Sequence, residues 1–232
     1  MGKELNLEIA YTKTRVLSPD DSILETHKIL TSQKKGPISD AYEFLRTQVM
    51  FRMMEQGWNV LAVTSPGTEE GKTLTAINLA IAIARKLDTT TLLIDANLGS
   101  PAIHRHLDLG VSKGLIDYIV NDTPVEELFV HPSIERLTVL PGGQPVENTV
   151  DLITSPKMFG LVNELKHRYA SRIIIFDLPP LLNTAEALAF SPYIDAILLV
   201  VKAGTTQKND VEQALRLLEK TPIIGTVLNQ GK

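Results

Sequence analysis

Short runs of apolar residues alternate with segments of helical periodicity along most of this chain, and that alternation constrains its fold more than any other feature. The runs at 172–177 and 196–201 are almost continuously apolar, as in parallel strands covered on both faces. Six strands are expected, over residues 58–64, 90–96, 136–141, 172–177, 196–201 and 222–228. Helices are expected over residues 39–56, 72–87, 155–169 and 207–220, with short helices within 101–129. The order predicts an α/β fold with a doubly wound, mainly parallel sheet flanked by helices.

The N-terminal part of the chain lacks this alternation. It is polar and weakly patterned, so we expect a loosely packed lead-in over residues 1–36 and a single domain over residues 37–232. The first helix of the domain is expected to begin at a Ser39 cap and to end at Gly57. Its expected apolar face consists of Ala41, Phe44, Leu45, Val49 and Met53.

Composition excludes several classes of function. The net charge of -4 gives no electrostatic footprint for nucleic acid, and the absence of cysteine excludes disulfides, thiolate catalysis and cysteine-ligated zinc. The N-terminus has no apolar signal core, and no stretch approaches the roughly 20 apolar residues that span a bilayer. We therefore expect a cytoplasmic protein with no direct membrane insertion, which reaches a membrane only through a partner.

The segment from Thr64 to Thr73, "TSPGTEEGKT", predicts a phosphate-binding loop. It lies between an expected strand and an expected helix, so its backbone N–H groups and the helix N-terminus would point at an anion, with Lys72 adding a full charge. Pro66 replaces the usual first glycine, and a solvated turn is the alternative. The expected nucleotide contacts, for ATP or ADP, are Gly67, Thr68, Glu69, Glu70, Gly71, Lys72, Thr73 and Leu74.

Two carboxylates support the nucleotide interpretation. Asp95 and Asp177 each end an expected strand, and the ligand crevice of an open α/β sheet lies outside the carboxyl ends of its strands. Hard oxygen ligands beside a phosphate loop are typical of magnesium, with the Thr73 hydroxyl as a further ligand. Either aspartate alone would be read as a turn residue; together with Lys72 and Thr73 they predict a magnesium–nucleotide site.

These motifs resemble the bacterial tyrosine kinases of capsular and exopolysaccharide synthesis, which share a P-loop superfamily with the Min and Par ATPases. The resemblance covers about residues 37–230. It is carried by "VLAVTSPGTEEGKT", by "VVKAGTT" and "GTVLN" near the end, and above all by "IIIFDLPP", which matches the family's Asp-x-Pro-Pro motif at Asp177.

The resemblance implies an ATP-dependent protein-tyrosine kinase with a P-loop NTPase fold. Lys72 would then bridge the β- and γ-phosphates, and Thr73, Asp95 and Asp177 would surround the magnesium ion. Asp95 is also the candidate base for the incoming hydroxyl. Asn229 resembles a residue that contacts adenine, although a polar residue closing the last strand is an equal alternative. The implied partners are a membrane-bound polysaccharide co-polymerase or activator at the inner face of the plasma membrane and further copies of the chain.

The chain departs from the family pattern at several positions. Asn97 and Gly99 replace the second aspartate and the arginine of an Asp-x-Asp-x-Arg motif, and Glu69 stands where glycine is usual. Glu43 reverses a charge on a helix that docks subunits in the family's rings, where Asp40 and Arg46 hold the neighbouring motif positions. A nucleotide-binding regulator or scaffold with weak or no kinase activity is therefore an alternative. A Min/Par-type positioning ATPase is another, although Gly67 replaces the early lysine that is usual in that class.

Overall fold

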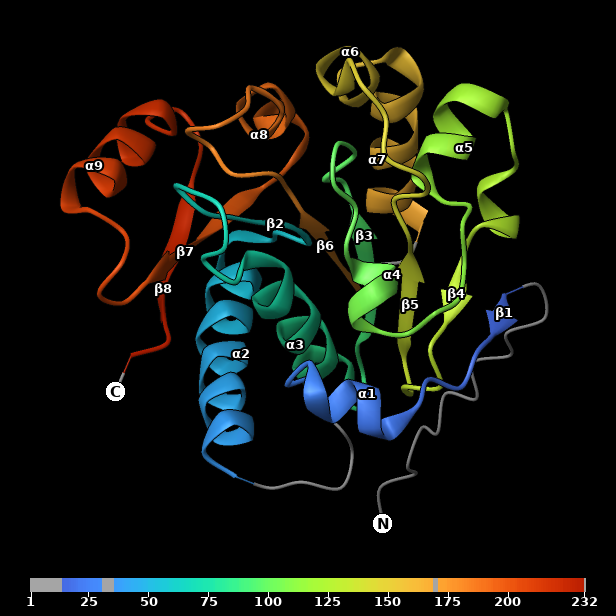
Figure 1. The fold of residues 1–232 in the computed structure, drawn as a ribbon, viewed down its shortest axis with the longest axis horizontal. Coiled ribbons are helices and arrows are strands. Elements are labelled where there is room, and N and C mark those ends of the chain that lie inside the picture. Colours follow the sequence, from blue (N-terminus) through green and yellow to red (C-terminus); the bar gives the residue numbers. More distant parts are fainter. Residues whose placement is uncertain (1–13, 31–35, 169–170, 232) are drawn as a thin grey trace.

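An eight-stranded sheet forms the centre of the protein in a computed structural model that describes residues 14–30, 36–168 and 171–231 (Figure 1). The strand order is β1-β4-β5-β3-β6-β2-β7-β8, and every pairing is parallel except β4 with β5. The strands are β1 (Arg15–Val16), β2 (Val60–Thr64), β3 (Thr90–Asp95), β4 (Val130–His131), β5 (Leu137–Leu140), β6 (Arg172–Asp177), β7 (Ala196–Lys202) and β8 (Ile223–Asn229). The six expected strands and the mainly parallel sheet are confirmed.

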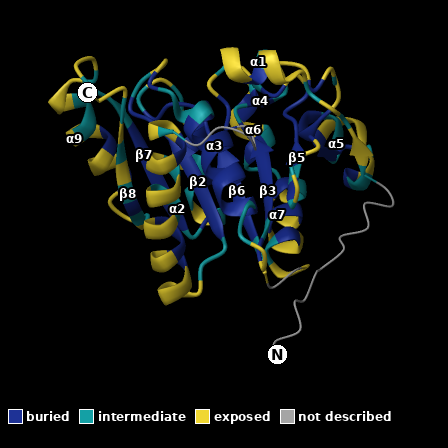
Figure 2. Ribbon diagram, turned by 90° about the horizontal axis from the view of Figure 1, so that it is seen from below, coloured by how far each residue is buried: buried dark blue, intermediate teal, exposed yellow. Residues whose placement is uncertain are grey.

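Helices cover both faces of the sheet, because adjacent residues of a strand face opposite ways. In β2, Val63 packs into one apolar cluster with α1 to α4, and Ala62 packs into a second cluster with α5 to α9. Figure 2 shows the strands as a buried layer between helices with exposed outer surfaces. The helices are α1 (Asp21–Thr26), α2 (Pro37–Gln56), α3 (Lys72–Ala84), α4 (Ile103–His106), α5 (Leu115–Asn121), α6 (Thr149–Ile153), α7 (Pro156–Arg168), α8 (Glu186–Phe190) and α9 (Lys208–Leu217).

Helix α2 differs in detail from the expectation. It begins at Pro37, whose fixed φ and missing N–H suit the first helical position, so Ser39 lies inside the first turn and is not the cap. Its end at Gly57, in the left-handed conformation with φ 67°, is as expected. The helix buries Val49 and Met53, but Ala41 is exposed and Phe44 is 68% exposed, so these two do not belong to the buried face.

The segment 14–30 is packed against the domain, so the expected loose lead-in is wrong for this part of the chain. Strand β1 pairs with β4 at the edge of the sheet, and Asp20 caps the N-terminus of α1, because its carboxylate accepts a hydrogen bond from the Ser22 backbone N–H. Leu24 and Leu30 are buried in the cluster that includes α3. This segment contains too few apolar residues for a helical or strand periodicity to be recognised in its sequence. The rest of the predicted lead-in, 1–13 and 31–35, lies outside the described residues.

A buried asparagine joins this segment to α3. Asn78 is fully buried; its Oδ1 accepts from the Leu30 backbone N–H at 2.9 Å, and its Nδ2 donates to the Lys28 carbonyl at 3.0 Å. Helix α3 begins at the end of the predicted phosphate loop, so the same contact fixes the helix that follows that loop.

We expect Asn78→Ala to lower the free energy of unfolding by about 2–4 kcal/mol, because it leaves the Leu30 N–H and the Lys28 carbonyl without their partner. Urea unfolding followed by circular dichroism measures the change. Asn121→Ala is the control, since Asn121 makes an exposed side-chain bond whose loss should cost less than about 0.5 kcal/mol. Equal effects of the two substitutions would contradict a stabilising role for Asn78.

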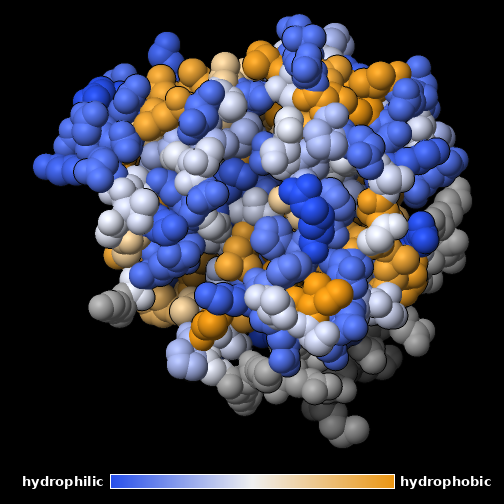
Figure 3. Space-filling view, viewed as in Figure 1, coloured by the Kyte–Doolittle hydropathy of each residue, from blue (hydrophilic) through white to orange (hydrophobic). Residues whose placement is uncertain are grey.

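Among the described residues, no helix combines the length and the apolar character needed to cross a bilayer. On the face drawn in Figure 3, apolar side chains gather in separate patches within a largely hydrophilic surface.

Candidate nucleotide site

The predicted site residues converge at the carboxyl edge of three neighbouring strands. Strands β3, β6 and β2 are adjacent, and Asp95 is the direct register partner of Asp177. Helix α3 starts at Lys72, after the loop that leaves β2. The apolar strands thus carry two carboxylates and a helix N-terminus to one place, as the sequence motifs require.

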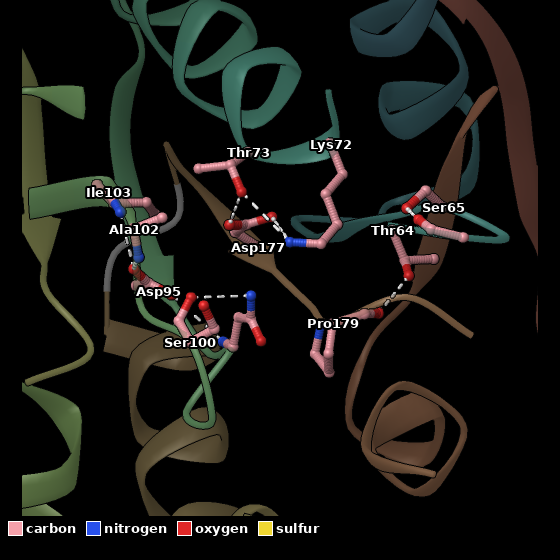
Figure 4. Close-up of polar contacts among 12 residues, drawn as sticks. Thr64, Ser65, Lys72, Thr73, Asp95, Ser100, Ala102, Ile103, Asp177 and Pro179 are labelled. Carbon is pink, nitrogen blue, oxygen red and sulfur yellow. Dashed lines mark hydrogen bonds and ion pairs between the residues drawn. The ribbon is translucent and has the colours of Figure 1, made fainter. Parts of the chain in front are cut away.

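Lys72, Thr73 and Asp177 form a compact polar group. The Thr73 hydroxyl donates to Asp177 Oδ2 at 2.6 Å, and Lys72 Nζ lies 3.3 Å from Thr73 Oγ1 and 3.6 Å from Asp177 Oδ1. Figure 4 shows both side chains pointing from the start of α3 toward the aspartate. Burial raises the pKa of Asp177, and the Lys72 charge and the Thr73 hydrogen bond oppose that rise. A fully buried carboxylate is therefore held beside a lysine that is itself largely buried.

This group fits a magnesium ion. Asp177 Oδ1 is buried and, apart from its ion pair with Lys72 at 3.6 Å, has no hydrogen-bond partner among the described residues, so this oxygen could bind a cation. The Thr73 hydroxyl lies beside the same carboxylate and is the kind of hard oxygen ligand that magnesium prefers. Thr73 and Asp177 are thus the residues that would hold the ion.

Asp95 is held differently. Its Oδ2 accepts from the backbone N–H groups of Ala102 at 2.8 Å and Ile103 at 2.9 Å (Figure 4). Its Oδ1 accepts a longer bond from the Asn97 N–H at 3.3 Å. Burial, followed by the negative charge of Asp177, raises the pKa of Asp95 to about 7. Such a carboxyl is suited to accept a proton near neutral pH. The oxygens of Asp95 accept more hydrogen bonds than those of Asp177. Its predicted role as a magnesium ligand stays a prediction.

Asn97 and Gly99 lie in the turn that follows β3. The Asn97 side-chain amide donates to the Ser100 carbonyl at 3.1 Å, so its nitrogen closes this turn. A Cβ on Gly99 would lie 3.8 Å from the Thr149 methyl group, which is ordinary contact. No steric demand therefore explains the glycine.

The phosphate loop is shaped from within by Glu70. The Gly67 N–H donates to Glu70 Oε2 at 3.1 Å, so in this conformation it points into the loop and not toward a ligand. At the other end of the loop, Gly71 has φ 89° and precedes the first turn of α3, whose N–H groups have no intrahelical acceptor. The N–H groups of Lys72, Thr73 and Leu74 are therefore available to an anion, and their predicted contact with phosphate stays a prediction.

Asn229, at the end of β8, contacts the same loop. Its Nδ2 donates to the Glu70 carbonyl at 2.9 Å, and a Cβ added to Gly71 would collide with its amide. This contact and the positive φ of Gly71 (89°) both disfavour a side chain at position 71. The predicted contact of Asn229 with adenine stays a prediction.

Glu69 adopts the left-handed conformation, with φ 57°, and its side chain is exposed, as is that of Thr68. We expect Glu69→Gly to tighten Mg-ATP binding about two- to fivefold, because it removes a negative charge near the phosphates and lets the loop backbone adjust to them at lower cost. Isothermal titration calorimetry measures the affinity. Glu69→Gln is the matched control, since it removes the charge and keeps a side chain that restricts the backbone. Unchanged or weaker affinity in Glu69→Gly would show that Glu69 is harmless or useful.

Sequence reasoning missed the groups that hold the carboxylates. The donors to Asp95 are the backbone N–H groups of Ala102 and Ile103. Backbone donors cannot be recognised from the residue types in a sequence. The inward orientation of Glu70 could not be foreseen either, because its partner Thr206 follows a strand distant in sequence.

Comparisons with known proteins agree with this geometry. Residues 61–231 match the family of the CobQ/CobB/MinD/ParA nucleotide binding domain. The chain is 30% identical over 198 residues to the "Putative tyrosine-protein kinase CapB" of Staphylococcus aureus, covering 84% of this chain and 86% of that protein. The chain belongs to the bacterial tyrosine kinase family. It is also 29% identical over 213 residues to the tyrosine-protein kinase YwqD of Bacillus subtilis, covering 91% of this chain and 89% of that one.

Solved structures of the family support the same assignment. The crystal structure of the chimerical protein CapA2B2 aligns with a TM-score of 0.81 at 27% identity, covering 94% of this chain and 93% of that one. The MinD septum site-determining protein of Pyrococcus horikoshii, solved with Mg-ADP, aligns with a TM-score of 0.62 at 21% identity, covering 73% of this chain and 69% of that one. The second likeness confirms the P-loop fold. The expectation of a nucleotide-binding domain is likewise confirmed.

Proposed function

We propose that this protein is an ATP-dependent protein-tyrosine kinase that regulates capsule or exopolysaccharide synthesis. The observation that carries the proposal is the pairing of Asp95 and Asp177 beside Lys72, on a chain that belongs to the tyrosine kinase family. ATP is the proposed phosphoryl donor, with magnesium as cofactor. The proposed location is the cytoplasmic side of the plasma membrane, where a membrane-bound co-polymerase or activator would recruit the protein.

The proposal gives each residue a role. The first turn of α3 and Lys72 would bind and orient the β- and γ-phosphates. Thr73 and Asp177 would hold a magnesium ion, which would supply charge neutralisation to the phosphates. Asp95 accepts the proton of the tyrosine hydroxyl as the tyrosine oxygen bonds to the γ-phosphorus. The bond from that phosphorus to the β-phosphate oxygen breaks, and ADP leaves with the electron pair.

Asn97 favours the second candidate, a regulator or scaffold with weak kinase activity. An amide cannot accept a proton as a carboxylate does, and its nitrogen is committed to Ser100. A positioning ATPase remains the third candidate. Such a protein would hydrolyse ATP, transferring the γ-phosphate to water and not to tyrosine.

The proposed self-association has to differ from the family's ring pattern. Arg46, at one docking position, donates to the Ala82 carbonyl of its own chain at 3.2 Å. Glu43, at the next, is exposed and bears the opposite charge to the family's arginine. An oligomer that relied on these arginines would be weakened here.

The fate of the γ-phosphate distinguishes the three functions. The purified chain is incubated with Mg-ATP labelled at the γ-phosphate and a glutamate–tyrosine copolymer. Labelled phosphotyrosine, free phosphate and bound ATP are then measured separately in the same sample. The kinase proposal expects label on tyrosine, on the copolymer or on the chain. Bound ATP with neither product would support the regulator, and free phosphate without phosphotyrosine would support the ATPase.

A further inference from the structure

The loop that follows β7 is tied to the phosphate loop by one side chain, Thr206. Its hydroxyl donates to Glu70 Oε1 at 2.5 Å and accepts from the Lys202 backbone N–H at 3.0 Å. Thr206 is thus held by its own loop and in turn holds a carboxylate that is only 5% exposed. The two residues are 136 positions apart in the chain.

Glu70 forms hydrogen bonds with three segments: the phosphate loop, the loop after β7 and the end of β8. Its Oε2 accepts from the Gly67 N–H across the phosphate loop, its Oε1 accepts from Thr206, and its backbone carbonyl accepts from Asn229. Among the described residues, no cation forms an ion pair with its carboxylate. Neutral donors alone therefore stabilise this buried charge.

Because Glu70 carries a negative charge, the direction in which its carboxylate points affects the binding of a triphosphate. A carboxylate turned toward the ligand would repel a triphosphate, and the repulsion would be strong in a partly buried loop. The two hydrogen bonds keep the carboxylate inside the loop. Without the Thr206 hydroxyl, Oε1 would lack a donor, so the carboxylate would turn out of the loop toward water, where its charge would oppose a bound triphosphate.

We propose that Thr206 is a positioning residue for the phosphate loop, which it shapes through Glu70 and thereby sets the affinity for the triphosphate. The inference rests on the proposed nucleotide site and deepens it. The order β3-β6-β2-β7-β8 puts Asp95 and Asp177 on one side of the loop and Thr206 on the other. A nucleoside extending away from the carboxylates would therefore pass near the Thr206 loop, so the test has to separate a contact with the nucleoside from an effect on the phosphate loop.

The experiment compares Mg-ATP with inorganic magnesium tripolyphosphate, which has no nucleoside, by calorimetric titration of the full chain. Thr206→Val removes the hydroxyl at nearly constant volume, and we expect it to weaken both ligands by about tenfold, the loss of one charge-assisted hydrogen bond. Thr206→Ser restores the hydroxyl and should bind both within about twofold of the wild type. Thr205→Val, at an exposed neighbouring residue, is the control.

A double variant distinguishes a specific effect through Glu70 from a general loss of folding. In a Glu70→Gln background, Thr206→Val should have less than about twofold further effect, because the two residues act through one contact. Weakening of Mg-ATP alone, or of neither ligand, would overturn the inference. So would failure of Thr206→Ser to restore affinity, or additive losses in the double variant. A wild-type chain that binds no Mg-ATP would instead refute the proposed function itself.

Discussion

Lys72→Ala is expected to weaken Mg-ATP binding by at least about 100-fold and to abolish phosphotyrosine formation. The lysine is the cation of the polar group at the start of α3, 3.6 Å from Asp177 Oδ1. Its loss removes a full charge from the phosphate site. It also removes the charge that most lowers the pKa of Asp177 against the effect of burial, so that carboxyl would be protonated more readily and would bind magnesium less well.

Calorimetry measures the binding, and phosphotyrosine is detected with a specific antibody. Lys208→Ala is the matched control, because the Lys208 side chain is 92% exposed and removing it makes the same change in net charge. The control should leave both quantities within about twofold of the wild type. Wild-type affinity in Lys72→Ala would contradict the assignment of the phosphate site.

Asp95→Asn is expected to lower kcat by about 10²- to 10⁴-fold while Mg-ATP binding changes little, since the substitution removes a general base and not a phosphate ligand. The amide oxygen can still accept from the Ala102 and Ile103 N–H groups, which keeps α4 in place. Thermal unfolding checks that the variant is folded. An equal loss of affinity and of kcat would indicate that Asp95 acts in magnesium binding and not as the base.

The same residue predicts the pH dependence of the reaction. The pKa of Asp95 is about 7 in the free protein, raised by burial and by Asp177. A base has to be unprotonated to act, so kcat/KM should fall about tenfold per pH unit below pH 7 and level off above it. Asp95→Asn should lose this acidic limb. A wild-type profile that is flat from pH 6 to pH 8 would contradict the role of Asp95.

The sheet and the placement of the carboxylates could be predicted from the sequence. Strand β6 and its neighbours are apolar on both faces, and parallel strands place their carboxyl ends at one edge, so Asp95 and Asp177 had to meet. The phosphate loop followed from Gly71, Lys72 and Thr73 between a strand and a helix. These features depend on local pattern and on general rules of sheet geometry.

The remaining features depend on contacts between distant segments. Asn78 binds Leu30 across 48 positions, and neither residue type marks the 14–30 segment as part of the core. Glu70 was expected to contact the nucleotide, but its carboxylate is turned inward by Gly67 and Thr206. Propensity and periodicity carry no information on which buried donor a carboxylate will find.

Transfer of the γ-phosphate of ATP to tyrosine at this site can be followed in a single turnover. Wild-type protein and Asp95→Asn are loaded with the same amount of γ-labelled Mg-ATP, the bound nucleotide is quantified, and phosphoamino-acid analysis counts the label on tyrosine. We expect labelled phosphotyrosine from the wild type and at least about 100-fold slower labelling by the variant at equal occupancy. Full occupancy of the wild type with no label on tyrosine would contradict this transfer.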